Sequence, residues 1–342
     1  MVSLIRLKLI ALSIVGASFA FMAQTAQAEQ WKFAIEEIQG SVQDAYAQEL
    51  KKRIEQKTGG DVEVVIYPYG ALGTSADLTE LTTAGVLQLA NASPGHLGTL
   101  VGEIQVFSIP YLLSQDNSVN KEVLTSSSCI YDKLAGDFES KGLKLLTMYP
   151  EGEMVWTTNK KITSPGDFSN FKMRVMVSPL LVKAYEAFGA SPTPMPYGEV
   201  YGGLQLGQID GQVNPIFAIE EMKFYEVTDY MIWAGQQQFT TTVVASNDWY
   251  NGLSSERRQM LDQTVSELAD YIFRVQAQFN EERLEKIKKE KPELEMIHLN
   301  EQQRAAFKQR AQQVRDKYVD MVGGKGKEVL DCLSEEFGTA SM

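Results

Sequence analysis

The spacing of apolar residues in the first half of the chain switches between the two-residue period of strands and the 3.6-residue period of helices. One helix is predicted from Ser41, with Asp44 completing a capping-box-like start, to the Gly59-Gly60 pair that stops it. The predicted order is strand Trp31–Ile35, this helix, strand Val62–Tyr67, helix Thr74–Gly85, strand Val86–Ala90 and loop Asn91–Gly95. Such alternation is typical of an α/β lobe with a largely parallel sheet.

The second half of the chain restarts this alternation after a turn at Thr163–Asp167. Ser178 is predicted to cap a helix with Pro179 in its first position and Gly189 just beyond its end. The further predictions are helix Lys121–Lys141, strand Leu143–Tyr149, strand Lys172–Val177, extended segment Ser191–Pro196, helix Val200–Gln208, strands Ile209–Val213 and Thr240–Ser246, and helices Ser255–Lys289 and Glu301–Val322. No flexible linker separates the halves, so we expect two lobes side by side, with the chain crossing between them more than once.

The N-terminus has the pattern of a secretory signal peptide. Arg6 and Lys8 precede the apolar run Leu9–Met22, which is too short for a comfortable membrane span, and Ala26-Gln27-Ala28 is a small-x-small cleavage site. Cleavage after Ala28 leaves 314 of the 342 residues and changes the net charge from −12 to −14. We therefore expect a periplasmic protein; an uncleaved anchor helix is the alternative.

Composition narrows the functional classes. The chain is 44% hydrophobic and 22% charged, as in folded globular proteins. Its acidity and the lack of a long basic stretch argue against nucleic-acid binding. Two histidines and two cysteines, all far apart, do not form a usual zinc pattern, so we expect no metal and no cofactor.

The two cysteines leave a question open. In an oxidising compartment Cys129 and Cys332 can form a disulfide. Their separation of about 200 residues does not say whether their Cα atoms come within ~7 Å of each other. A disulfide and a pair of buried free thiols therefore both remain possible.

The chain carries no catalytic motif of the phosphate-loop, nucleophile-elbow, zinc-protease or C-x-x-C type. We therefore do not expect an enzyme. The alternative from this class is an exported hydrolase that works with two carboxylates. Glu37 and Glu153 are the pair we would nominate for it, although no motif supports them.

A set of segments carries a stronger signal. They are Val65–Gly73, Phe107–Leu112, Asn170–Val175, Pro196–Gln205 and Gly207–Pro215. Together with the signal peptide, they resemble the extracytoplasmic solute-binding proteins of TRAP transporters (the DctP family), over essentially the whole mature chain. The resemblance implies a two-lobed α/β periplasmic binding protein with a ligand cleft between the lobes and a long helix near the C-terminal third. We expect lobe I at 29–153 and 240–282, and lobe II at 154–239 and 283–342.

The resemblance also implies roles for individual residues. Arg174 matches the carboxylate-binding arginine of the family, and a guanidinium can give two parallel hydrogen bonds to a carboxylate. Asn214, in a turn context before Pro215, is expected to contact the same carboxylate. Within the family the chain looks most like the ectoine- and hydroxyectoine-binding members, in which Glu37 would face the cationic ring of the ligand.

Two positions depart from those members. His96 and Tyr197 stand where the ectoine binders have an aromatic residue and a tryptophan, so the aromatic cage around a cation would be reshaped. Phe217 and Phe239 are candidates for its remaining walls, with ordinary core packing as the alternative for both. His96 is either a donor to a polar ligand group or a structural histidine.

The expected function is therefore capture of a small organic carboxylate and its delivery to the TRAP membrane permease. A monocarboxylate or a zwitterion is favoured over a dicarboxylate, because Glu153–Trp156 lacks the second arginine that many dicarboxylate- and sugar-acid-binding relatives have there; of the two, we expect a zwitterion. The alternative ligands are a C4-dicarboxylate, pyroglutamate, a sugar acid or a sulfonate. A structural or adhesive protein is a remote alternative.

Overall fold

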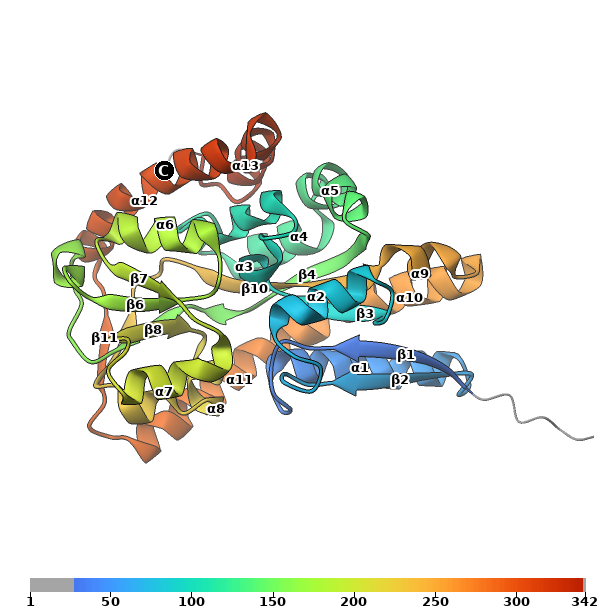
Figure 1. Ribbon diagram of the computed structural model, residues 1–342, viewed down its shortest axis with the longest axis horizontal. Coiled ribbons are helices and arrows are strands. Elements are labelled where there is room, and N and C mark those ends of the chain that lie inside the picture. Colours follow the sequence, from blue (N-terminus) through green and yellow to red (C-terminus); the bar gives the residue numbers. More distant parts are fainter. Residues whose placement is uncertain (1–27, 341–342) are drawn as a thin grey trace, which may run out of the picture.

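The computed structural model describes residues 28–340, which form two mixed β-sheets flanked by helices (Figure 1). Within this part of the chain the first sheet has the strand order β2-β1-β3-β10-β4, and the second has the order β11-β9-β5-β8-β6-β7. The predicted signal peptide at 1–28 lies almost wholly outside the described residues, so its cleavage after Ala28 stays a prediction. No helix within 28–340 has the length and apolarity to cross a membrane.

The first sheet combines parallel and antiparallel neighbours. β1 pairs in parallel with both β2 and β3, whereas β10 runs antiparallel to β3 and β4. Its strands are β1 (Glu29–Ala34), β2 (Val62–Tyr67), β3 (Leu89–Ala92), β4 (Leu143–Glu153) and β10 (Gln238–Ser246). β10 thus joins this sheet from a point late in the sequence, as expected for a chain that crosses between two lobes.

The second sheet is built in the same way. β6 pairs in parallel with β7 and β8, and β9 with β11, while β5 runs antiparallel to β8 and β9. Its strands are β5 (Val155–Thr158), β6 (Lys172–Val175), β7 (Ser191–Pro194), β8 (Gly211–Asn214), β9 (Tyr230–Trp233) and β11 (Glu295–His298). β4 and β5 are separated by Met154 alone, and β9 and β10 by a short segment, so these two links connect the sheets.

Helices cover both sheets. The α-helices are α1 (Val42–Lys57), α2 (Ser75–Thr83), α3 (Pro94–Leu97), α4 (Asn117–Ser126), α5 (Ala135–Ser140), α6 (Pro179–Phe188), α7 (Val200–Gln205), α8 (Ile216–Glu221), α9 (Asn247–Gly252), α10 (Ser255–Glu267), α11 (Ala269–Glu290), α12 (Glu301–Val322) and α13 (Gly324–Glu336). The long α11 packs against β4 of the first sheet and α8 beside the second, and Figure 1 shows it running between the two halves. The long helix expected in the C-terminal third is therefore present.

Local signals set several boundaries. α6 begins at Pro179 after its Ser178 cap and ends at Gly189, which has a φ of 101°, as the sequence predicts. α12 spans the predicted Glu301–Val322. The helix predicted at Lys121–Lys141 is wrong as one piece, because the backbone turns to an extended conformation at Ser127. The loop predicted at Asn91–Gly95 instead holds the end of β3 and the start of α3.

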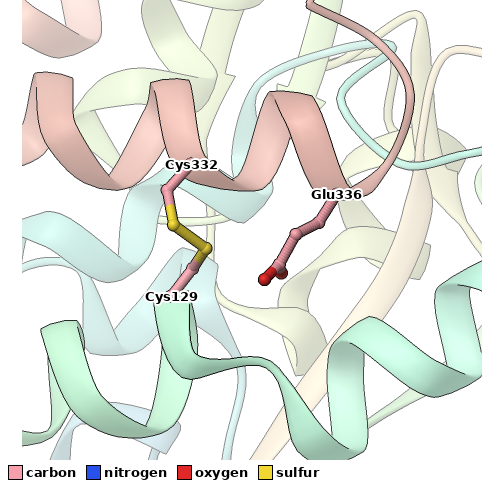
Figure 2. Close-up of side chains that lie close together, drawn as sticks. All are labelled: Cys129, Cys332 and Glu336. Atoms are coloured by element: carbon pink, nitrogen blue, oxygen red, sulfur yellow. A yellow bond between two sulfur atoms is a disulfide. The ribbon is translucent and has the colours of Figure 1, made fainter.

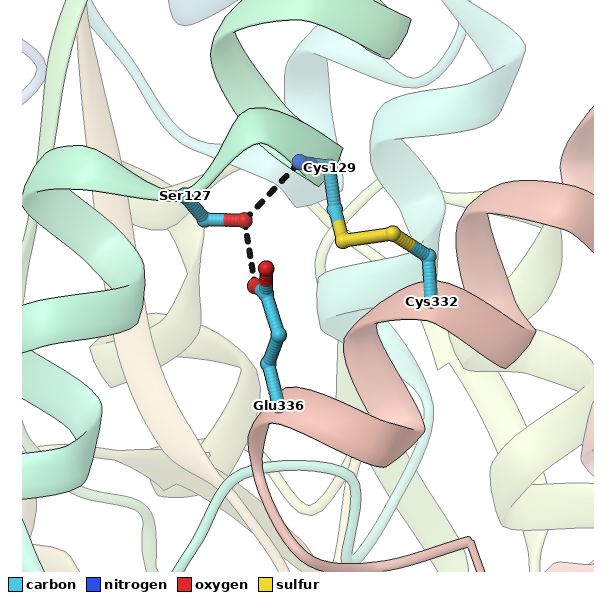
Figure 3. The surroundings of a disulfide bond; sticks show 4 residues. All are labelled: Ser127, Cys129, Cys332 and Glu336. Atoms are coloured by element: carbon cyan, nitrogen blue, oxygen red, sulfur yellow. Dashed lines mark hydrogen bonds between the residues drawn. A yellow bond between two sulfur atoms is a disulfide. The ribbon is translucent and has the colours of Figure 1, made fainter.

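A disulfide between Cys129 and Cys332 fastens the last helix to the first half of the chain (Figure 2). The Cα atoms are 5.9 Å apart, which resolves the alternative of two free thiols. Ser127 joins the two elements again, because its hydroxyl donates to Glu336 and accepts from the Cys129 main-chain N–H at 3.0 Å (Figure 3). Because both sulfurs are bonded to each other, this group of two cysteines and one carboxylate does not offer thiolates to a metal.

Candidate functional site

A pocket with about 360 Å³ of empty space, open solvent at its mouth included, lies between residues of the two sheets. The lining residues are Glu36, Glu37, Gln43, Ser75, Ser93, His96, Arg174, Met176, Tyr197, Asn214, Ala218 and Phe239. The structure therefore brings six of the seven predicted site residues together, from segments that span about 200 positions of the sequence.

Arg174 lies on β6 and is only 1% exposed. Its Nε and Nη2 both donate to the main-chain oxygen of Met195, at 3.0 and 2.8 Å, and no carboxylate within residues 28–340 pairs with it. Burial lowers the pKa of Arg174 to about 10, so the guanidinium is still charged at neutral pH. The Nη1–Nη2 edge, which the Met195 carbonyl leaves open, is suited to a carboxylate from outside the chain.

Asn214 ends β8 on the same side of the pocket and is 7% exposed. Its Nδ2 donates to the side-chain oxygen of Gln212, and Gln212 in turn donates to the hydroxyl of Thr157 at 2.8 Å. This chain of amides fixes the orientation of Asn214 and leaves its remaining polar capacity for the pocket.

Glu37 follows β1 and approaches the pocket from the other sheet. The main-chain N–H of Gln43, in the first turn of α1, donates to its Oε2 at 3.2 Å. Burial raises the pKa of Glu37, while hydrogen bonds from Glu151, Gln43 and Ser41 pull it back. The pocket thus presents the buried Arg174 guanidinium from one sheet and the hydrogen-bonded Glu37 carboxyl group from the side of the other.

His96 is held by a second carboxylate, Glu36, which the sequence pattern does not single out. Its Nδ1 is 3.2 Å from Glu36 Oε1 and 3.0 Å from Ser93 Oγ. The other Glu36 oxygen accepts from the Ser93 main-chain N–H at 2.8 Å. This geometry favours the structural role predicted for His96, because the ring has partners within the fold. Its side chain nevertheless also lines the pocket.

Tyr197 is a wall of the pocket whose hydroxyl is buried and has no partner among the described residues. Its ring meets the edges of Tyr69 and Phe224, with centroids 5.7 and 5.9 Å away. Burial keeps the pKa of Tyr197 well above its usual value, so the hydroxyl stays neutral. Phe239 also lines the pocket, whereas Phe217 is fully buried in the hydrophobic core and lies outside the lining.

Contacts between the two halves surround the pocket. The Tyr69 hydroxyl, beyond β2, accepts from the Gly198 main-chain N–H at 3.1 Å. A Cβ on Gly198 would lie 3.2 Å from that oxygen, so glycine permits this close approach. On another side, the Gln105 side-chain oxygen accepts from the Leu180 N–H at the start of α6, at 3.1 Å.

The carboxylate pair nominated for a hydrolase is not brought together. Glu153 lies beside Tyr111 in a separate pocket and accepts from the Gly235 main-chain N–H at 3.1 Å. Two other acids lie near Glu37 instead. Glu151 is fully buried on β4, and burial followed by the charge of Glu37 raises the pKa of Glu221 to about 9. An acid in a strand or a short helix has no sequence signature that separates it from an exposed one, so both were missed.

Comparisons with known proteins agree with this architecture. Residues 33–320 match the family described as bacterial extracellular solute-binding protein, family 7. The chain is 44% identical over 324 residues to the ectoine-binding periplasmic protein TeaA of Halomonas elongata, covering 95% of this chain and 94% of TeaA. It is 43% identical over 330 residues to the ectoine/5-hydroxyectoine-binding periplasmic protein UehA of Ruegeria pomeroyi, covering 96% and 97%.

Solved structures lead to the same group. The periplasmic ectoine-binding protein of the TeaABC TRAP transporter of Halomonas elongata superimposes with a TM-score of 0.88 at 44% identity, covering 91% of this chain and 99% of that one. A TRAP periplasmic solute-binding protein from Marinobacter aquaeolei in an apo open form gives 0.84 at 39% identity, covering 89% and 99%. The two-lobed fold predicted from the sequence is therefore confirmed.

Proposed function

Because the chain belongs to the bacterial extracellular solute-binding proteins of family 7, we propose that it is the solute receptor of a TRAP transporter and that it captures ectoine or a closely similar zwitterion. One observation carries the ligand class: a buried arginine without a carboxylate partner and a buried, hydrogen-bonded carboxylate line the same pocket. The ligand carboxylate would take the open edge of Arg174, and its positive charge would lie against Glu37.

The energetics favour a ligand with both charges. A buried charge without a partner costs several kcal/mol, and a matched, hydrogen-bonded pair recovers most of this cost. A dicarboxylate would satisfy Arg174 but place its second anion near Glu37. A cation alone would leave Arg174 unpaired. Micromolar binding needs about −8 kcal/mol, which two such pairings and the aromatic faces of Tyr197 and Phe239 can supply.

Capture would work by closure of the two lobes. We keep the expected division, lobe I at 29–153 and 240–282 and lobe II at 154–239 and 283–342, as part of this proposal. The two sheets change over at Met154, which supports the boundary at 153/154, and between β9 and β10, within two residues of the boundary at 239/240. The third boundary, at 282/283, lies inside α11 (Ala269–Glu290) and has no such support from the sheets. The apolar side of α13, however, packs with residues of the first half, and the disulfide holds it there. Since only the closed form contacts the ligand from both sides, binding favours that form, which the membrane permease would recognise.

The same relatives support a periplasmic location and a binding role for this chain. TeaA and UehA are periplasmic binding proteins, and the predicted signal peptide suits export to that compartment. We propose a receptor and not an enzyme, because Glu37 shares the described pocket with an arginine and the other nominated carboxylate, Glu153, lies in a separate pocket.

Binding of ectoine to residues 29–342, after unfolding and refolding to remove carried-over ligand, tests the proposal. Ectoine at 100 times its Kd should add about 2.7 kcal/mol, a rise in melting temperature of roughly 4 °C for a chain of this size. C4-dicarboxylates, pyroglutamate, sugar acids and small sulfonates form the comparison panel. Calorimetry should show that Arg174→Gln weakens ectoine binding by about 100-fold.

A matched control is Arg315→Gln. Arg315 is half-buried and donates to Ser334 and Thr339 near α13, away from the pocket, so the affinity for ectoine should not change. Binding of another acid from the panel, with no response to ectoine, would retain the receptor and refute the ligand. No response to any of them would refute the receptor proposal itself.

A further inference from the structure

Glu151 lies behind the ligand-facing Glu37 and is completely buried. It projects from β4, and the two side chains are within hydrogen-bonding contact of each other. Gln43 bridges them, because its main-chain N–H donates to Glu37 Oε2 at 3.2 Å and its side-chain Nε2 donates to Glu151 Oε1 at 3.0 Å. Two buried carboxyl groups in contact cannot both be ionised, so they share one proton.

The donors around the pair decide which group carries this proton. Glu37 receives hydrogen bonds from the Gln43 main chain and from Ser41. Glu151 receives one, from the Gln43 side chain, and its Oε2 is buried with no donor among the described residues. The better-solvated carboxylate is Glu37, and the orphaned Oε2 of Glu151 becomes satisfied if it bears the proton and donates to Glu37.

We propose that Glu151 is a positioning residue that remains neutral, donates a hydrogen bond to Glu37, and thereby keeps Glu37 as the anion that faces the ligand's positive charge across the pocket from Arg174. This inference rests on the proposed function. A neutral Glu151 keeps Glu37 anionic toward the ligand's positive charge. An ionised Glu151 would give the pocket an excess of negative charge and favour a simple cation over a zwitterion.

The surroundings of the pair agree with a neutral Glu151. Burial, followed by the charge of Glu37, raises the pKa of Glu151 well above its usual value. Among residues 28–340 no lysine or arginine pairs with Glu151 to offset this effect, and from α11 the Asn280 amide donates to its main-chain oxygen at 2.7 Å. The titratable groups beside the pair are Glu36, Tyr149, Tyr197 and Glu221. One step further out, Asp44 and Arg283 lie near Glu221, Tyr46 near Tyr149, His96 beside Glu36 and Arg174 near Tyr197.

Two substitutions separate positioning from charge. Glu151→Gln keeps the shape, is neutral at every pH and can still donate to Glu37, so its affinity for ectoine at pH 7 should stay within about threefold of wild type. Glu151→Leu cannot donate, so the affinity should fall by about 10-fold or more. Glu153→Gln, two residues along the same strand and outside the pocket, is the matched control and should not change the affinity.

The pH profile gives a readout that loss of packing alone would not move. The hydrogen bond from Glu151 lowers the pKa of Glu37. The acidic decline of ectoine affinity should therefore begin about one pH unit higher in Glu151→Leu, and stay in place in Glu151→Gln. An unmoved decline in Glu151→Leu, or a Glu151→Gln variant as weak as Glu151→Leu, would overturn the inference.

A ligand-free measurement keeps the inference testable even if ectoine does not bind or Glu151→Leu does not fold. In ¹³C-carboxyl NMR of the glutamate-labelled apo protein at pH 7, Glu151→Gln should remove a resonance with the shift of a neutral carboxyl. Glu221→Gln identifies the signal of Glu221, whose pKa is raised to about 9, and Glu153→Gln that of Glu153, whose pKa is also raised. Loss of an ionised resonance in Glu151→Gln would refute a neutral Glu151, whereas failure of ectoine binding with the neutral resonance present would refute only the proposed ligand.

Discussion

Removal of the disulfide offers a quantitative test of how the fold is held together. Cys129 and Cys332 are 203 residues apart in the sequence, so their bond closes a very long loop in the unfolded chain. The loop-entropy relation for this length gives about 5 kcal/mol of stabilisation. The mature chain of 314 residues unfolds with an entropy of about 0.7 kcal/mol per degree, so Cys129→Ala with Cys332→Ala should lower the melting temperature by roughly 8 °C.

The assay is calorimetric unfolding of wild type and of the double-alanine variant, with ectoine affinity measured in parallel. Neither cysteine lines the ligand pocket, so the affinity at 25 °C should remain unchanged. Reduction of the wild-type protein with a thiol should approach the same melting temperature. A fall of less than about 2 °C would show that α13 is held by its apolar contacts, among them Leu330, Leu333 and Phe337, and would refute the entropic reasoning.

Three further outcomes follow from the pocket. Burial raises the pKa of Glu221 to about 9, so the folded state holds a proton that the unfolded state releases, and the free energy of unfolding should fall as pH rises from about 5 to 9. In denaturant melts Glu221→Gln should flatten this fall, and stability–pH curves that run parallel in the variant and wild type would refute the prediction. Tyr69→Phe removes the acceptor of the Gly198 N–H and should weaken ectoine binding about 2- to 10-fold by calorimetry. An unchanged Kd would show that this contact does not contribute to binding. Tyr197→Trp replaces an unbonded hydroxyl with a larger ring face and should tighten binding of a cationic ring about threefold; weaker binding would mean that Tyr69 and Phe224 leave it no room.

Elements with strong local signals were predictable from the sequence. Ser178, Pro179 and Gly189 delimit α6 by capping chemistry that depends on a few neighbouring residues. In contrast, the sequence pattern did not predict the two short strands β9 (Tyr230–Trp233) and β11 (Glu295–His298). β11 is an edge strand of four residues whose only partner is β9, so its existence depends on tertiary pairing rather than on its own pattern.

The candidate site divides in a similar way. Arg174, Asn214 and Glu37 lie in segments that resemble a known family, so their common location could be expected. Glu151 and Glu36 could not, because their importance comes from burial beside other groups, which a single sequence does not encode visibly. Phe217 shows the converse. As an aromatic residue three positions after Asn214 it was a candidate wall of the pocket, but its place in α8 puts its side chain in the hydrophobic core.

The charges of the pocket explain why such a receptor can distinguish its filled from its empty state. Among residues 28–340 no carboxylate pairs with Arg174, and the groups that donate to Glu37 are neutral. Closure of the lobes around an empty pocket would dehydrate both charges without pairing either of them, which is unfavourable. A zwitterion removes both costs at once, whereas an anion or a cation removes one. On the proposed function, selectivity for the ligand and the preference for closure would therefore arise from the same two side chains.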